Sequence, residues 1–355
     1  MTPALEVRSP GAYTSIQDGG RRGLRRIGMP WAGVLDPAAL CIANRLVGNP
    51  DTAPVLECFE GGQRLAAMDG PLRLAVAGAA QLTVESDGRR MRMAAWRSFV
   101  LQADETLRIE RIDDGRVVVV AVEGLTIAPV LGSAATYARS RIGGLDGAPL
   151  AAGDRLPLAA VARARAELHL PAARLPEARA AAPIRVLPGP QDEHFDAATL
   201  ARFFAAEWRI SMHADRMGMR LEGPRLAHRP ERGADIVSDA TVPGAIQVPG
   251  NGQPIVLLAD GQTAGGYPKI GVVITADLGR LATRAPGSAL RFAAVDAEAA
   301  EAAAATAAAT HEAQLAGIVP LPAASDIDLD ALYRHNLVDG VIDALSPDSP
   351  PPGHS

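Results

Sequence analysis

A chain of 355 residues is too long for one typical hydrophobic core, so its length favours about two domains. Hydrophobic residues make up 48% and charged residues 21%, which is ordinary globular usage and predicts that most of the chain folds. The formal net charge of -5, without a long basic run, argues against nucleic-acid and anionic-membrane partners.

Residues 1–150 consist of short apolar runs broken by turns, which predicts an N-terminal β-rich module. One helix is predicted in it, because Asp36 can cap the N-terminus, Pro37 suits the first helical position and Gly48 can end the helix. Three Asp-Gly pairs lie between runs rich in Val, Leu and Ile, a spacing typical of β-hairpins: 69–70, 87–88 and 114–115.

Residues 151–182 are rich in Ala, Pro and Arg and have no regular period, so we expect a linker there. Residues 183–295 predict a second β-rich module, with a strand at IRVLP and a short helix that Asp196 can cap. In the same module AIQV and PIVLLA are expected to pair through an Asn-Gly turn. Residues 296–355 predict an Ala-rich surface helix and a partly disordered tail. The expected fold class is therefore mainly β with a few helices, an α+β protein of two β-rich modules.

The strand PIVLLA runs into Asp260, so the stretch GQTAGGYPKI that follows is expected to be a loop between two core strands, the second being IGVVITADL. Its lysine, Lys269, is the only lysine among the 35 Lys and Arg residues of the chain. Gly265 and Gly266 can turn backbone N–H groups toward an anion, and a lysine adds a point charge. We therefore predict a carboxylate- or phosphate-binding loop, with Tyr267 as a wall or hydroxyl donor. The plain alternative is a tight turn with a surface lysine.

Around this loop we take Lys269, Asp260 and Tyr267 as catalytic candidates. The other candidates are amides, hydroxyls, carboxylates and guanidinium groups that could orient a polar substrate or clamp its carboxylate. They are Gln262, Thr263, Gly265, Gly266, Gln247, Asp215, Arg216, Arg220, Asp18, Arg21 and Asp36. The charged ones outside the loop could equally be structural ion pairs or caps. The stretch RRGLRR (21–26) could attract an anion or be a solvated face.

Several familiar sites are excluded by spacing. A P-loop needs G-x-x-x-x-G-K-[ST], and Tyr267 and Pro268 stand before the lysine here. Biotin is usually carried on the lysine of a Met-Lys-Met turn, so the sole lysine, which follows proline, predicts that biotin is not attached to this chain. His194 and His213 have no partner at metal-ligand spacing, and we expect no metal site.

The two cysteines, Cys41 and Cys58, fit neither a redox pair nor a zinc site, and we expect free thiols in a reducing compartment. The N-terminus has no signal-peptide pattern, and no run of 18 apolar residues occurs. We therefore expect a cytoplasmic protein that does not cross a membrane.

Seven blocks together resemble one known family: TSIQDGGRRG (14–23), GMPWAGVLD (28–36), ANRLVGN (43–49), LPGPQ (187–191), DRMGMRLEG (215–223), VPGAIQVPGNGQPIVLLADGQTAGGYPKIGVV (242–273) and NLVDGVIDA (336–344). This is the carboxyltransferase-domain family, also labelled allophanate hydrolase subunit 2. It includes the C subunit of the bacterial ATP-dependent 5-oxoprolinase, the KipA-type antagonist of a kinase inhibitor, and the second half of the urea carboxylase carboxyltransferase domain.

The resemblance implies that the second module is similar to a cyclophilin-like barrel. It also implies ATP-driven opening of 5-oxo-L-proline, a small anionic substrate, to L-glutamate. The implied partners are a subunit-B-like (KipI-type) protein and the A subunit of lactam utilisation, with ATP bound at the complex. Two other roles remain open within the family: part of a biotin-dependent carboxyltransferase, or a KipA-type regulatory protein.

The chain departs from the family pattern at a few places. Ala32, Ala214 and Met219 stand where the family often has Ser, Ser and Tyr, so hydroxyls are lost there. The family also tolerates Arg at the position of Lys269, which favours a plain cation over a Schiff-base lysine.

Overall fold

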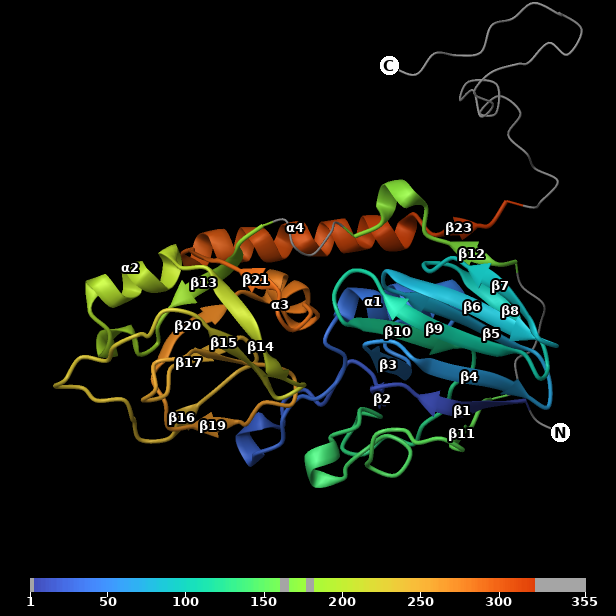
Figure 1. The fold of residues 1–355 in the computed structure, drawn as a ribbon, viewed down its shortest axis with the longest axis horizontal. Helices are drawn as coiled ribbons and strands as arrows, with labels where there is room; N and C mark the ends of the chain where they lie inside the picture. The colour runs from blue at the N-terminus through green and yellow to red at the C-terminus, as the bar shows by residue number, and fades with distance from the viewer. Residues whose placement is uncertain (1–2, 160–165, 177–181, 323–355) are drawn as a thin grey trace, which may run out of the picture. The chain divides into compact units, whose positions relative to one another are not determined.

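An antiparallel β-sandwich is built from most of the first 160 residues (Figure 1). The structure is a computed structural model that describes residues 3–159, 166–176 and 182–322. The six strands of the first sheet, in spatial order, are β11 (Arg155–Leu156), β1 (Ala4–Pro10), β4 (Gln63–Met68), β9 (Thr106–Ile112), β6 (Ala80–Ser86) and β7 (Arg89–Met93). The second sheet contains β2 (Tyr13–Gln17), β3 (Val55–Phe59), β10 (Val117–Val122), β5 (Leu72–Ala77) and β8 (Ser98–Leu101).

Strand β10 shows that the second sheet is buried on both of its faces. Its sequence VVVVAV is buried throughout, although successive side chains point to opposite faces of a sheet. Val118, Val120 and Val122 pack into the core between the two sheets. Val119 and Ala121 face the other way and pack with residues of α1 (Pro37–Val47), which lies against β5 and β10 (Figure 1).

The ends of α1 confirm the helix predicted from the sequence. Asp36 caps it by accepting a hydrogen bond from the Ala39 N–H at 3.1 Å, and Gly48 ends it with a φ of 81°. The hairpin interpretation of the Asp-Gly pairs is confirmed only at 87–88, which joins β6 to β7. It is wrong at 69–70 and 114–115, where the chain passes from one sheet to the other.

The second half of the chain forms an eight-stranded, nearly closed barrel-like sheet, in agreement with the barrel expected there. Its order is β21 (Ala289–Leu290), β14 (Trp208–Ala214), β15 (Gly218–Glu222), β18 (Ile255–Leu257), β17 (Ala245–Gln247), β20 (Lys269–Val273), β13 (Ile184–Pro188) and β22 (Phe292–Ala294). The predicted pairing of AIQV with PIVLLA is confirmed by β17 and β18. The predicted helix α2 (Ala197–Ala205) is capped by Asp196.

The strand predicted at IGVVITADL is correct only in its first half, since β20 ends at Val273 and α3 (Thr275–Ala282) begins two residues later. Leu278 and Leu281 of α3 pack against the apolar core of the barrel. They lie three residues apart, as on one face of a helix, and a short apolar stretch of sequence does not distinguish that spacing from a buried strand.

The remaining short elements are β12 (Leu168–His169), β16 (Asp239–Ala240), β19 (Ala264–Gly265), β23 (Val319–Pro320) and four 3-10 turns at Arg25–Ile27, Ala138–Ser140, Ala172–Arg174 and Asp192–His194.

The Ala-rich segment is a 20-residue helix, α4 (Ala297–Ala316), whose residues are mostly exposed. It contacts both α1 and α3, so it touches elements from both halves of the chain. Residues 1–320 form one compact unit. The module boundaries at 150 and 183 stay predictions, and the predicted disordered tail and the block at 336–344 lie outside the described residues. In the described part of the chain, no helix is long and apolar enough to span a membrane.

Asp277 of α3 should stabilise the barrel through its bonds to β13. The carboxylate is 3% exposed, accepts the Arg185 N–H at 2.7 Å and binds the Arg185 guanidinium at 2.7 and 3.0 Å. Burial opposes its ionisation, but the hydrogen bonds from Arg185 and the charge of Arg280 together outweigh this and hold the pKa of Asp277 below its usual range. Asp277→Asn is expected to lower the free energy of unfolding by about 2 kcal/mol at neutral pH.

Because the folded-state pKa is depressed, this stabilisation is present above the unfolded pKa and is lost as the pH falls through the folded one. Urea denaturation of both proteins between pH 7 and pH 3 checks this, with the exposed Asp113→Asn as control. Equal unfolding free energies of Asp277→Asn and the parent at pH 7 would contradict the assignment.

Candidate functional site

A cavity of about 370 Å³ lies where the sandwich meets the barrel. Its apolar wall includes Tyr13, Phe59, Tyr137 and Met217. Its polar groups are Glu60, Arg116 and Arg139 from the first half of the chain and Asp215, Arg216 and Asp260 from the second. A concave, largely apolar site with a few convergent polar groups is the usual form of a small-molecule binding site.

Arg216 is the central charge of this cavity. Its Nε and Nη2 donate to the two carboxylate oxygens of Asp260 at 3.1 and 2.9 Å, and Nη2 also donates to the Gly33 carbonyl at 2.6 Å. Its Nη1 donates to the carboxylate of Glu57 on β3. The network therefore joins the sandwich to the residue from which the predicted binding loop starts.

The charges of this network hold each other in place. Burial by itself would lower the pKa of Arg216, but the carboxylates of Glu57 and Asp260 raise it above its usual range. The second oxygen of Glu57 accepts the Leu35 N–H at 2.6 Å, so both of its oxygens are occupied. Because Arg216 is held by Glu57 and binds both oxygens of Asp260, the Asp260 carboxylate is fixed in position.

The loop after Asp260 is fastened to the first half of the chain by Arg25. The Arg25 guanidinium donates to the carbonyls of Thr241 and Gln262 at 2.8 Å each. The side chain of Gln262 donates to Gln247 at 3.0 Å. Gln247 is buried on β17, and its own Nε2 has no hydrogen-bond partner. The arginine-rich stretch at 21–26 thus contributes a structural tie to the loop.

Lys269 is not a surface residue, so the plain alternative for it is wrong. It is 2% exposed, and its Nζ donates to the Asp239 carboxylate at 2.8 Å and to the Ala240 carbonyl at 3.0 Å. The hydrogen bond from Lys269, with a second from Gln191, lowers the pKa of Asp239. The ammonium group is therefore paired, and Lys269 does not line the cavity.

The glycines and Tyr267 of the loop occupy different surroundings. Gly265 lies in β19, which pairs with β16, and a Cβ atom there would come within 2.5 Å of the Gln247 Nε2. The Gly266 carbonyl accepts the Ile236 N–H at 2.8 Å, and the Thr263 carbonyl accepts the Thr241 N–H at 3.0 Å. Tyr267 is 40% exposed. A side chain at position 265 would therefore require the Gln247 amide to shift.

Most of the remaining candidates hold the backbone. Asp18 accepts bonds from the Ser133 hydroxyl and the Ala134 N–H, both at 2.6 Å. Arg21 is buried and donates to the carbonyls of Val130 and Ser133 at 3.0 and 3.2 Å. These two residues fasten the same loop.

Asp36 caps α1, and Arg220 is exposed on β15. Asp215 lines the cavity while its Oδ1 accepts the N–H groups of Met217 and Gly218 at 2.8 and 3.1 Å. Of the predicted residues, the cavity therefore brings together Asp215, Arg216 and Asp260.

Sequence reasoning missed Glu57, Tyr13 and Arg116. Glu57 could have been found, because a carboxylate inside the apolar run VLECF of a fully buried strand requires a cationic partner. Tyr13 and Arg116 carry no such signal. Burial raises the pKa of Tyr13, so its phenol is neutral and can donate a hydrogen bond at neutral pH.

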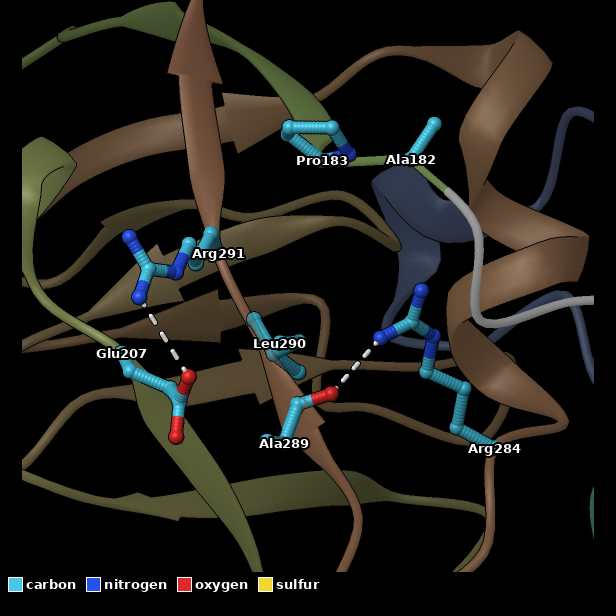
Figure 2. Close-up of a pocket in the computed structure, with 7 residues that line it drawn as sticks. All are labelled: Ala182, Pro183, Glu207, Arg284, Ala289, Leu290 and Arg291. Carbon is cyan, nitrogen blue, oxygen red and sulfur yellow. Dashed lines mark hydrogen bonds and ion pairs between the residues drawn. The ribbon is translucent and has the colours of Figure 1, made fainter.

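A second, smaller cavity of about 220 Å³ lies on the barrel (Figure 2). Its charged groups are occupied: Arg291 pairs with Glu207 at 3.4 Å, and the Arg284 Nη1 donates to the Ala289 carbonyl at 3.0 Å (Figure 2). None of the predicted site residues lines it. In the residues that the structure describes, no group of three His, Cys, Asp or Glu side chains could hold a metal ion. The larger cavity is therefore the candidate site.

Residues 27–294 match the family described as carboxyltransferase domain, subdomain A and B. The chain belongs to the carboxyltransferase-domain family. It is 39% identical over 292 residues to the 5-oxoprolinase C subunit of Escherichia coli, a match that covers 81% of this chain and 90% of that protein. It is 36% identical over 296 residues to the 5-oxoprolinase C subunit of Haemophilus influenzae, covering 83% and 91%.

Solved structures show the same carboxyltransferase-domain fold. The crystal structure of the Kluyveromyces lactis urea carboxylase is similar with a TM-score of 0.79 and 26% sequence identity. The similarity covers 90% of this chain but 30% of the urea carboxylase chain. The matched residues 27–294 include all residues that line the larger cavity except Ala12 and Tyr13, so most of the cavity lies within the carboxyltransferase domain.

Proposed function

We propose that this chain is the C subunit of an ATP-dependent 5-oxoprolinase, which converts 5-oxo-L-proline, ATP and water to L-glutamate, ADP and phosphate. The observation that carries the proposal is the extent of the match. The chain covers 90% of the Escherichia coli 5-oxoprolinase C subunit but 30% of the urea carboxylase chain. A chain that spans nearly the whole length of a 5-oxoprolinase C subunit can carry out the full role of that subunit. The proposed partners are a subunit-B-like protein and the A subunit of lactam utilisation.

The chemistry explains why several subunits and ATP are proposed. A lactam is a stable amide, and transfer of the terminal phosphate of ATP to its carbonyl oxygen turns that oxygen into a leaving group. Water then adds to the carbon and the ring C–N bond breaks, which frees the amine and leaves a carboxyl phosphate. A second water hydrolyses this carboxyl phosphate to the carboxylate of L-glutamate and free phosphate. The sequence has no P-loop, so we assign ATP binding to the complex and the small anionic substrate to the cavity. A cytoplasmic location is part of the proposal, since the reaction consumes ATP.

Turnover by the reconstituted complex tests the proposal. The full chain is purified with its proposed B-type and A-type partners, and ATP consumption and glutamate release from 5-oxo-L-proline are followed together. We expect one glutamate for each ATP consumed, and no turnover when this chain is left out. Absence of 5-oxoproline-dependent ATP consumption by the complex of all three proteins would refute the proposal.

A second candidate function is supported by the urea carboxylase structure, namely transfer of a carboxyl group from biotin to an acceptor. Biotin would have to be delivered by another protein, because the sole lysine, Lys269, follows Pro268, is buried and is paired with Asp239. Urea-dependent loss of the carboxyl group from carboxybiotin distinguishes this activity. Such activity without 5-oxoproline turnover would replace the first proposal by the second.

A further inference from the structure

Arg116 is a buried cation, and two of its three guanidinium nitrogens have no hydrogen-bond partner. It stands just before β10 and is 3% exposed. Its Nη1 donates to the Ala214 carbonyl at 2.8 Å, and its guanidinium carbon lies 5.1 Å from the centroid of the Phe59 ring. Its Nε and Nη2 have no hydrogen-bond partner. Buried donors without an acceptor are unfavourable, so these two call for an explanation.

The two unused nitrogens form the side edge of the guanidinium group. This edge presents two parallel N–H bonds, which match the two oxygens of a carboxylate. The same molecule shows the match at Arg216, whose Nε and Nη2 hold the two oxygens of Asp260. Arg116 lacks such a carboxylate. Burial lowers the pKa of Arg116, yet an arginine remains charged at neutral pH.

The surroundings of Arg116 specify the rest of the ligand. Arg116 lines the larger cavity, whose wall is apolar at Tyr13, Phe59, Tyr137 and Met217. The cavity of about 370 Å³ admits a small ring but not a large cofactor. Glu60 and Asp215 also line it, and like charges repel, so a ligand carboxylate is favoured beside Arg116 rather than beside these two residues.

We propose that the Nε and Nη2 of Arg116 bind the carboxylate of a small ring compound in this cavity, and, resting on the proposed function, that this compound is 5-oxo-L-proline. Its apolar ring carbons pack against the aromatic wall. Its lactam group then faces the Asp215 and Asp260 side of the cavity.

The test removes the ligand carboxylate and the arginine in turn. Binding of 5-oxo-L-proline and of pyrrolidin-2-one, the same ring without the carboxylate, is measured by titration calorimetry on the assembled complex without ATP. The proteins are the parent, Arg116→Gln and the exposed control Arg64→Gln on β4. We expect Arg116→Gln to weaken 5-oxo-L-proline binding roughly tenfold to hundredfold while leaving pyrrolidin-2-one unchanged. Equal weakening of both rings, or of neither, overturns the inference.

Ala138→Leu covers the case in which Arg116→Gln does not fold, since Ala138 also lines the cavity and the larger side chain fills it while leaving Arg116 intact. We expect it to abolish binding of both rings, and unchanged binding would also overturn the inference. The two proposals fail separately. Carboxylate-dependent binding through Arg116 without ATP turnover rejects the 5-oxoprolinase function alone. Turnover with an unchanged KM in Arg116→Gln rejects the role of Arg116 alone.

Discussion

Replacing Arg216 with methionine is expected to lower the free energy of unfolding by about 3–5 kcal/mol, because it leaves two buried carboxylates without their cation. Glu57 is fully buried on β3, and Asp260 is nearly so at the start of the loop. The guanidinium also donates to the Gly33 carbonyl, so the sandwich and the barrel lose a shared contact. The loss is measured as the denaturant dependence of tryptophan fluorescence and circular dichroism.

A matched control stands four residues away, where Arg220 is exposed on β15. Arg220→Met should change the free energy of unfolding by less than about 0.5 kcal/mol. The double variant Glu57→Gln with Arg216→Met should lose less than the sum of the single losses, since of the two buried carboxylates only Asp260 is then left without a cation. If Arg216→Met were as stable as Arg220→Met, the network would not contribute to holding the two halves together.

The parts of this fold that depend on local chemistry could be predicted from the sequence. Asp36 and Asp196 cap the helices expected of them, because an N-cap acts within three residues. The Asp-Gly pairs show the limit. Asp69 and Asp87 both have positive φ values, yet only the turn at 87–88 closes a hairpin. Which strand follows is decided by the apolar face it must bury, and that information lies in distant parts of the chain.

In the candidate site, too, local sequence patterns identify single residues but not the contacts between distant ones. Local loop patterns indicate Asp260 and Arg216 separately, but the Glu57 that binds Arg216 lies 159 residues before it. Arg116 stands beside an ordinary Asp-Gly turn, and only the folded chain brings it against Ala214. Lys269 stands out in the sequence because it is the sole lysine of the chain. Composition could not show that it is buried against Asp239.

Lys269→Ala is expected to abolish 5-oxoproline-dependent ATP turnover by the complex, a loss of at least about a hundredfold. The substitution removes the cation held by Asp239 and leaves the Ala240 carbonyl without its donor. It thereby releases β16, which pairs with the loop strand β19 at Gly265. Lys269→Arg should keep much of the rate, because a guanidinium can reach the same carboxylate.

Asp239→Asn separates the two ways in which Lys269 could act. If the ammonium serves mainly to hold β16, then Asp239→Asn should lower kcat together with Lys269→Ala. If the ammonium is released to bind an anionic substrate, Asp239→Asn frees it, and the rate should be kept while Lys269→Ala remains inactive. Arg64→Ala, an exposed cation on β4, is the control for loss of positive charge. Full turnover by Lys269→Ala would exclude both roles, because the loop would then work without its lysine.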